Sequence, residues 1–144
     1  MKFGQRGNEV FFPVITRPFD HSKRVNDTYG HVVGDLVLTG LSQVVGQVSK
    51  VDSVYRYGGE EVAVILPETG EDTATGMAER IRAAVGQRRF HIGEGQPPLQ
   101  IIVSIGVATF SRGSAAAHGL VEEADEALYR AKEGGRNRVC RHGA

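Results

Sequence analysis

The strongest fold signal in the chain is the stretch Ser53-Val54-Tyr55-Arg56-Tyr57-Gly58-Gly59-Glu60-Glu61-Val62-Ala63-Val64-Ile65-Leu66. Its two halves, Ser53–Tyr57 and Glu61–Leu66, are rich in β-branched and apolar residues, which favour strands. Gly58-Gly59 joins them and predicts a tight hairpin, because both glycines can adopt positive φ. Since neighbouring side chains of a strand point to opposite faces, Glu60 and Glu61 are expected to have different roles.

Helix and strand patterns alternate on both sides of this hairpin. The expected elements are a strand at 10–16, a helix at 35–48, the hairpin, a helix at 72–85, a loop at 93–98, a strand at 99–109 and a helix at 120–133. Pro13 predicts an edge position or an irregular segment for the first strand, and Gly134-Gly135 is expected to end the last helix. This order predicts an α/β (α+β) fold of the ferredoxin-like sandwich type, with a central, mostly antiparallel sheet flanked by helices. Nucleotidyl cyclases and polymerase palm domains share that architecture.

Size and charge narrow the classes of function. A chain of 144 residues suits a single domain. Its 17 basic and 17 acidic residues give no net charge, which argues against a nucleic-acid polymer or a membrane surface as partner. The single cysteine, Cys140, suits a reducing compartment, and no apolar run approaches the ~20 residues that span a bilayer. The chain is therefore expected to be cytoplasmic.

The chemistry is expected at the hairpin and at three other groups of polar residues. Gly58 and Gly59 would let a phosphate approach the backbone, and a neighbouring carboxylate could hold a hard divalent cation. The simpler alternative is a tight turn with two solvated acids. Asn26 and Asp35 offer the hydrogen-bonding groups that a guanine edge requires, or they cap turns. Lys132 and Arg136, four residues apart at the end of the last helix, form a phosphate clamp or are merely solvated.

The sequence as a whole resembles the GGDEF domain, the catalytic module of diguanylate cyclases. The resemblance covers roughly 19–139 and rests on five motifs in the family's order and spacing: Asp20-His21-Ser22-Lys23-Arg24-Val25-Asn26-Asp27-Thr28-Tyr29-Gly30-His31, Gly34-Asp35, Arg56-Tyr57-Gly58-Gly59-Glu60-Glu61, Val103-Ser104-Ile105-Gly106-Val107-Ala108, and Ala124-Asp125 through Leu128-Tyr129-Arg130-Ala131-Lys132 to Gly135-Arg136-Asn137. The domain expected on this basis is 19–140, after a divergent or truncated segment at 1–18 and before a tail at 141–144.

The resemblance implies a reaction in which two GTP molecules condense to cyclic di-GMP with loss of two pyrophosphates. Each domain would hold one GTP, so two copies must meet in a transient homodimer. It also implies a role for each matching residue. The phosphates would be contacted by Gly58, Gly59, Lys23, Lys132 and Arg136, and the guanine by Asn26 and Asp35. Glu60 would be catalytic and would bind Mg²⁺ or Mn²⁺ together with the Phe19 carbonyl, with Glu61 as a further candidate ligand.

Three departures from the family pattern qualify this reading. Pro18 stands where active members usually carry a second metal-binding aspartate, so a degenerate module that binds GTP and regulates a partner without turnover is the alternative. Ser22 replaces the usual aromatic residue. The stretch Ser49-Lys50-Val51-Asp52 lacks the arginine of the usual product-inhibition motif, which predicts weak or absent feedback inhibition.

Overall fold

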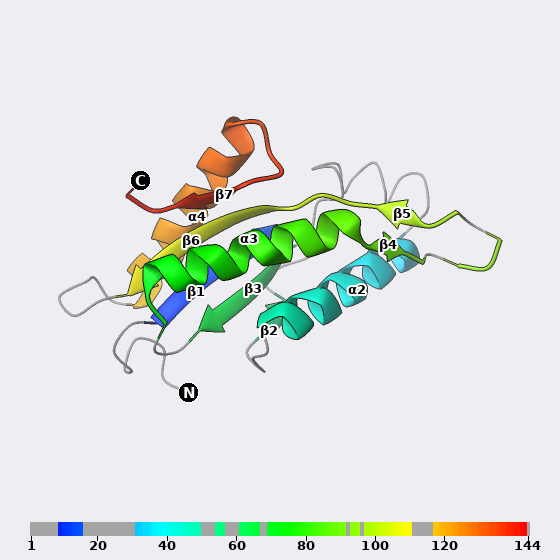
Figure 1. Ribbon diagram of the computed structural model, residues 1–144, viewed down its shortest axis with the longest axis horizontal. Helices are drawn as coiled ribbons and strands as arrows, with labels where there is room; N and C mark the ends of the chain where they lie inside the picture. The colour runs from blue at the N-terminus through cyan, green and yellow to red at the C-terminus, as the bar shows by residue number, and fades with distance from the viewer. Residues whose placement is uncertain are drawn as a thin grey trace.

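The computed structural model describes residues 9–15, 31–49, 54–56, 61–66, 69–91, 93–95, 97–110 and 117–143 (Figure 1). Its elements in chain order are β1 Glu9–Ile15, α2 His31–Ser49, β2 Val54–Arg56, β3 Glu61–Leu66, α3 Glu71–Gln87, β4 Arg89–Phe90, β5 Leu99–Gln100, β6 Ser104–Phe110, α4 Ala117–Glu133 and β7 Val139–Arg141. Across these residues, no helix is both long and apolar enough to cross a membrane.

Five strands form the main sheet, in the order β2-β3-β1-β6-β7. The β2–β3, β3–β1 and β1–β6 pairs are antiparallel, and β7 adds to the edge parallel to β6. In a ferredoxin-like fold the elements follow one another as strand, helix, strand, strand, helix, strand. That order produces the arrangement of β1, β2, β3 and β6 in this sheet. The predicted α+β fold with a mostly antiparallel sheet is confirmed.

The prediction for Pro13 was wrong, because β1 lies in the centre of the sheet between β3 and β6. Pairing with β3 is continuous from Val10 to Ile15, and Pro13 lies opposite Ala63. Pairing with β6 covers Glu9–Phe11 and resumes at Val14 in the same register. Proline removes one backbone donor only, so a central strand accommodates it where the ladder to one neighbour pauses.

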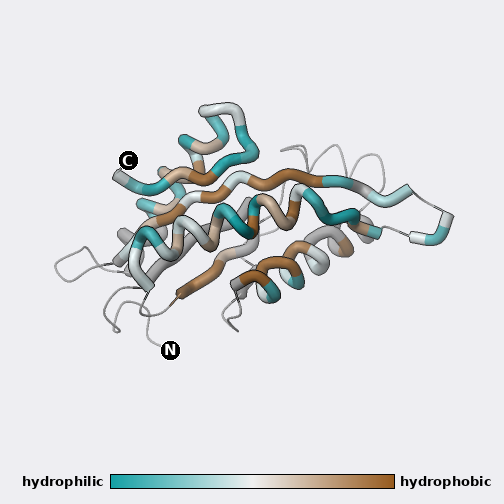
Figure 2. Tube along the Cα trace, in the orientation of Figure 1, coloured by the Kyte–Doolittle hydropathy of each residue, from teal (hydrophilic) through white to brown (hydrophobic). Residues whose placement is uncertain are grey.

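Helices cover both faces of the sheet (Figure 1). On one face, α2 and α3 pack on alternate residues of β3 and β6, and the core includes Leu41, Val45, Val64, Leu66, Ile81, Val85, Ile105 and Val107. On the other face, α4 packs closely against β6, with Ala124, Ala127, Leu128 and Ala131 buried. Figure 2 shows the hydrophobic residues concentrated on the sheet and on α2, with hydrophilic residues in the turn that follows α4.

Gly106 of β6 sets how closely α4 approaches the sheet. A Cβ atom built at Gly106 would lie 2.3 Å from the Ala124 carbonyl oxygen and 2.4 Å from the Leu128 backbone nitrogen. Both neighbours are backbone atoms of α4, so only a residue without Cβ permits this contact. The small side chains on the facing side of α4 serve the same close approach.

The short elements differ most from the sequence-based expectation. The single strand predicted at 99–109 is divided into β5, which pairs with β4, and β6, which enters the main sheet. Neither β4 nor β7 was predicted, because two or three residues are too few to show an alternating pattern. The first helix begins at His31 rather than Asp35, since Gly34, a poor helix former, obscures its start in the sequence.

Candidate functional site

One end of the main sheet gathers the ends of the described elements that border the predicted site residues in the sequence. Ile15, the last residue of β1, pairs with Glu61 at the start of β3 and with Ser104 at the start of β6. Val139 begins β7 beside Ile105. The chain therefore leaves β1 and enters β3, β6 and β7 at the same end, and α2 runs from this end back toward the start of β2 (Figure 1).

Four predicted site residues lie on described backbone near this end. Asp35 is in the second turn of α2, Glu61 is the first residue of β3, Lys132 is in the last turn of α4, and Arg136 is in the turn that leads to β7. The remaining candidates and the unusual proline lie outside the described residues: Pro18, Phe19, Lys23, Asn26, Gly58, Gly59 and Glu60. The side chains of Asp35 and Glu61 also lie outside the description, so their roles stay predictions.

The strand register brings together the two described residues that flank the predicted metal ligands in the sequence. Glu60 immediately precedes Glu61, and Phe19 follows Ile15 by four residues, while Ile15 and Glu61 are paired. A carboxylate and a backbone carbonyl are hard oxygen ligands of the kind that Mg²⁺ prefers. Among the described residues, no three His, Cys, Asp or Glu side chains come together as an alternative metal site. These two donors are therefore chemically suited to Mg²⁺, and their role stays a prediction because Phe19 and Glu60 lie outside the described residues.

The last helix ends between Lys132 and Arg136, as the sequence predicted. Helix α4 stops at Glu133. The Gly135 amide then donates to the Lys132 carbonyl at 3.2 Å, and the Arg136 amide donates to the Ala131 carbonyl at 2.9 Å. These two bonds form a Schellman motif, in which a glycine in the left-handed region closes the helix. The predicted stop at Gly134-Gly135 is confirmed, and it turns the chain before Arg136.

We define the α4–β7 turn as Gly134–Arg138. Its backbone has three consecutive positive φ angles, 119° at Gly135, 66° at Arg136 and 46° at Asn137. Glycine and asparagine tolerate this region, but for arginine it costs about 1–2 kcal/mol. Surrounding contacts must therefore hold Arg136 in this conformation.

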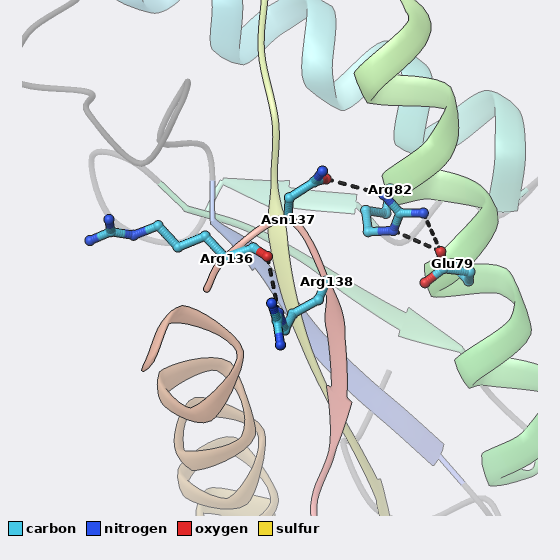
Figure 3. Close-up of polar contacts among 5 residues, drawn as sticks. All are labelled: Glu79, Arg82, Arg136, Asn137 and Arg138. Atoms are coloured by element: carbon cyan, nitrogen blue, oxygen red, sulfur yellow. Dashed lines mark hydrogen bonds and ion pairs between the residues drawn. The ribbon is translucent and has the colours of Figure 1, made fainter. Parts of the chain in front are cut away.

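Two arginines that the sequence reasoning did not single out provide such contacts (Figure 3). Arg138 donates from Nε to the Arg136 carbonyl at 3.1 Å, and its own carbonyl accepts from the Ile105 amide at 3.0 Å, which anchors the turn to β6. Arg82 of α3 donates from Nη1 to Oδ1 of Asn137 at 3.1 Å. The turn is thus joined to the sheet and to a helix on the opposite face.

Arg82 is itself held by Glu79, one turn earlier in α3. Its Nε donates to Oε1 of Glu79 at 2.7 Å, and its Nη2 contacts the same oxygen. The hydrogen bond and the charge of Glu79 raise the pKa of Arg82 above its ordinary value, against the opposing effect of partial burial. The guanidinium therefore stays charged while one nitrogen reaches Asn137.

The sequence matches a known family over most of its length. The family described as Diguanylate cyclase, GGDEF domain, matches residues 5–138. Diguanylate cyclase A of Treponema denticola is 40% identical over 127 residues, which are 88% of this chain and 34% of that protein. Diguanylate cyclase DgcP of Pseudomonas aeruginosa is 41% identical over 134 residues, 92% of this chain and 19% of that protein. The chain thus spans about a third or less of the length of these relatives.

Solved structures show the same fold. The GGDEF domain of DgcB from Caulobacter crescentus, crystallised in complex with c-di-GMP, superposes with a TM-score of 0.83 at 34% identity, over 96% of this chain and 77% of that one. The active GGEEF domain of a diguanylate cyclase from Vibrio cholerae superposes with a TM-score of 0.79 at 29% identity, over 96% of this chain and 85% of that one.

Proposed function

This chain belongs to the GGDEF domain family, and we propose that it condenses two GTP molecules to cyclic di-GMP and two pyrophosphates. The observation that carries the proposal is Gly58-Gly59-Glu60-Glu61 at the entry to β3, whose first residue pairs with the last residue of β1. The active GGEEF domain of the Vibrio cholerae diguanylate cyclase carries a glutamate at the same third position of the signature. A glutamate there is thus compatible with activity in a relative.

The proposed roles follow the chemistry of each side chain. The backbone at Gly58 and Gly59 would donate hydrogen bonds to phosphate oxygens, and Lys23, Lys132 and Arg136 would neutralise their charge. Asn26 can donate and accept, while Asp35 accepts from the guanine N–H groups. Glu60 and the Phe19 carbonyl would hold Mg²⁺ or Mn²⁺, which when bound stabilises negative charge on the phosphates.

The reaction is a phosphoryl transfer in which positioning dominates. The 3′-hydroxyl of one GTP attacks the α-phosphorus of the other, the new P–O bond forms, and the bond to the β-phosphate breaks in line with it. Glu60 would accept the hydroxyl proton, and pyrophosphate leaves. A second, equivalent transfer closes the ring. Because each copy would present one GTP, two copies must face each other, and turnover should rise with protein concentration.

Pro18 supports a second candidate, a domain that binds GTP and regulates a partner without turnover. Proline offers no carboxylate, so the proposed ion has fewer anionic ligands than in the usual family pattern. A weakly held ion would leave nucleotide binding largely to the phosphate and guanine contacts. Turnover, which needs neutralisation of the developing charge, would suffer most.

Incubation of the concentrated chain with GTP and Mg²⁺ or Mn²⁺, followed by chromatography of the nucleotides, separates the two candidates. Cyclic di-GMP that disappears in Glu60→Gln supports the enzyme. Binding of GTP with no product, at concentrations that produce dimers, supports the module instead. Pro18→Asp is expected to raise the rate by improving ion binding, while Pro97→Asp, an exposed proline in the β4–β5 connection, is the matched control that should leave it unchanged.

A further inference from the structure

The contact between Arg82 and Asn137 joins two parts of the chain that are 55 residues apart. Arg82 is in the C-terminal half of α3, whereas Asn137 lies in the α4–β7 turn, beside the residue proposed to bind phosphate. The Arg82 side chain is only 24% exposed, and Glu79 fixes two of its nitrogens. A guanidinium restrained in this way can hold a partner in place, because its fork geometry is already fixed.

The conformation of the turn explains why such a partner matters. Arg136 and Asn137 both have positive φ, which the unfolded chain rarely adopts and which the folded chain must maintain through contacts. The Schellman bonds fix Gly135 and the Arg136 amide from the side of α4. The Arg82 contact fixes Asn137, the next residue, from the side of α3. Arg136 is therefore restrained from both directions along the chain.

The side chains of the turn point in different directions (Figure 3). Asn137 points toward Arg82 and α3, whereas Arg136 extends its guanidinium to the opposite side of the turn. The two side chains are adjacent in sequence, so rotation of the backbone at Asn137 would also redirect Arg136. Fixing the side-chain amide of Asn137 thus constrains the direction in which the Arg136 side chain extends.

We propose that Arg82 and Asn137 are positioning residues for phosphate binding, because their hydrogen bond holds the turn from which Arg136 reaches the triphosphate of GTP. The inference rests on the proposed binding of GTP by this chain, but not on turnover. Neither side chain is assigned contact with the nucleotide. Their effect is expected on affinity for the triphosphate and not on recognition of the base.

A double-mutant cycle on the intact chain tests the proposal. The variants are Arg82→Ala, Asn137→Gly and their combination, and the ligand is a GTP analogue with a methylene bridge between the α and β phosphorus atoms, titrated calorimetrically with Mg²⁺. Asn137→Gly removes the side-chain amide that accepts the hydrogen bond, but glycine still allows positive φ. The variant therefore measures the loss of the hydrogen bond without adding backbone strain. Arg89→Ala, which removes an exposed arginine of β4, is the matched control for charge.

Each single variant is expected to weaken binding of the analogue about fivefold, which corresponds to ~1 kcal/mol. The double variant should be no weaker than the single variants, and Arg89→Ala should bind as the wild type does. Guanosine, which has no phosphate, should bind all variants equally when followed by NMR. A purely structural role would instead weaken guanosine and the analogue together.

Several results would overturn the proposal. These are unchanged affinity for the analogue in Arg82→Ala, additive losses in the double variant, or parallel losses for guanosine. A wild-type chain that binds the analogue but forms no cyclic di-GMP from GTP refutes the proposed enzyme activity and leaves the positioning role standing. A wild-type chain that binds neither the analogue nor GTP refutes both the positioning role and the proposed enzyme activity.

Discussion

Replacing Gly106 by alanine should displace α4 from the sheet and destabilise the whole domain. The new Cβ atom would lie 2.3 Å from the Ala124 oxygen and 2.4 Å from the Leu128 nitrogen, and 2.9 Å from the Leu128 Cα atom. A normal contact needs roughly 3.4 Å, so α4 must move by about 1 Å at this point. The obstructing atoms all belong to the α4 backbone, so they cannot move aside as the end of a flexible side chain could.

The energetic consequence follows from what α4 buries. Ala124, Ala127 and Ala131 are fully buried, and Leu128 is nearly so. A gap of up to 1 Å forfeits a quarter to a half of each affected dispersion contact, and overpacking of a core typically costs about 1–3 kcal/mol. We expect the upper end of that range, about 3 kcal/mol, since the obstruction is backbone. For a domain of this size the melting temperature should fall by roughly 10 °C.

Thermal and urea unfolding followed by circular dichroism provides the measurement. Gly76→Ala is the matched control, because Gly76 is an exposed residue inside α3 with nothing within 4 Å of a new Cβ atom. Alanine is the better helix former by about 0.5–1 kcal/mol, so this control should raise the melting temperature by a few degrees. If Gly106→Ala melts as the wild type does, the close seating of α4 on β6 is refuted.

Three further outcomes are expected. Gly135→Ala should lose about 1–2 kcal/mol of stability in urea unfolding and should weaken GTP binding. The reason is that a φ of 119° is strained for any residue with a side chain, and the new Cβ atom would lie 2.5 Å from the Arg138 guanidinium. Unchanged GTP binding would contradict the role of the turn. Desolvation raises the pKa of Asp125. The folded chain therefore binds this proton more tightly than the unfolded chain, and stability should fall as pH rises from about 4 through the folded pKa. In melting curves recorded as a function of pH, Asp125→Asn should reduce the loss of stability over this pH range. If the variant and the wild type lose stability with the same slope, Asp125 does not contribute. Added cyclic di-GMP should leave the initial rate nearly unchanged because Ser49–Asp52 lacks the usual arginine, and strong inhibition would show another product site.

Long periodic segments were predictable from the sequence, and short or strained ones were not. The helices α3 and α4 were predicted within three residues at each end, because their apolar residues recur at the helical period. Pro13 was misjudged because the rule against central prolines assumes that both neighbouring ladders need every donor. In this sheet the pairing with β3 continues through Pro13 and the pairing with β6 resumes after it.

The candidate site was predictable only in part, for a different physical reason. Motif spacing singled out Lys132 and Arg136 as candidates, whose role stays a prediction, and Gly134-Gly135 already signalled that the helix ends between them. Spacing could not reveal the Arg82–Asn137 contact, because it depends on how α3 and the α4–β7 turn meet in space. The run Gly135-Arg136-Asn137-Arg138 carried a usable signal, since asparagine beside glycine favours left-handed backbone.

The strand register also explains why Pro18 and the α4–β7 turn should affect different steps. Residue 18 follows β1 in the sequence, and Glu60 precedes β3, the strand paired with β1, so a change at residue 18 would act on the proposed ion. Arg136 lies in the turn that precedes β7, which is paired with β6, and the neighbouring Asn137 accepts a hydrogen bond from Arg82 of α3. We therefore expect the proposed binding of the triphosphate to persist where the proposed ion is weakly held. Pro18→Asp should change turnover more than affinity, whereas Arg82→Ala should change affinity first. Equal effects of both variants on both quantities would show that the ion and the turn act as one unit.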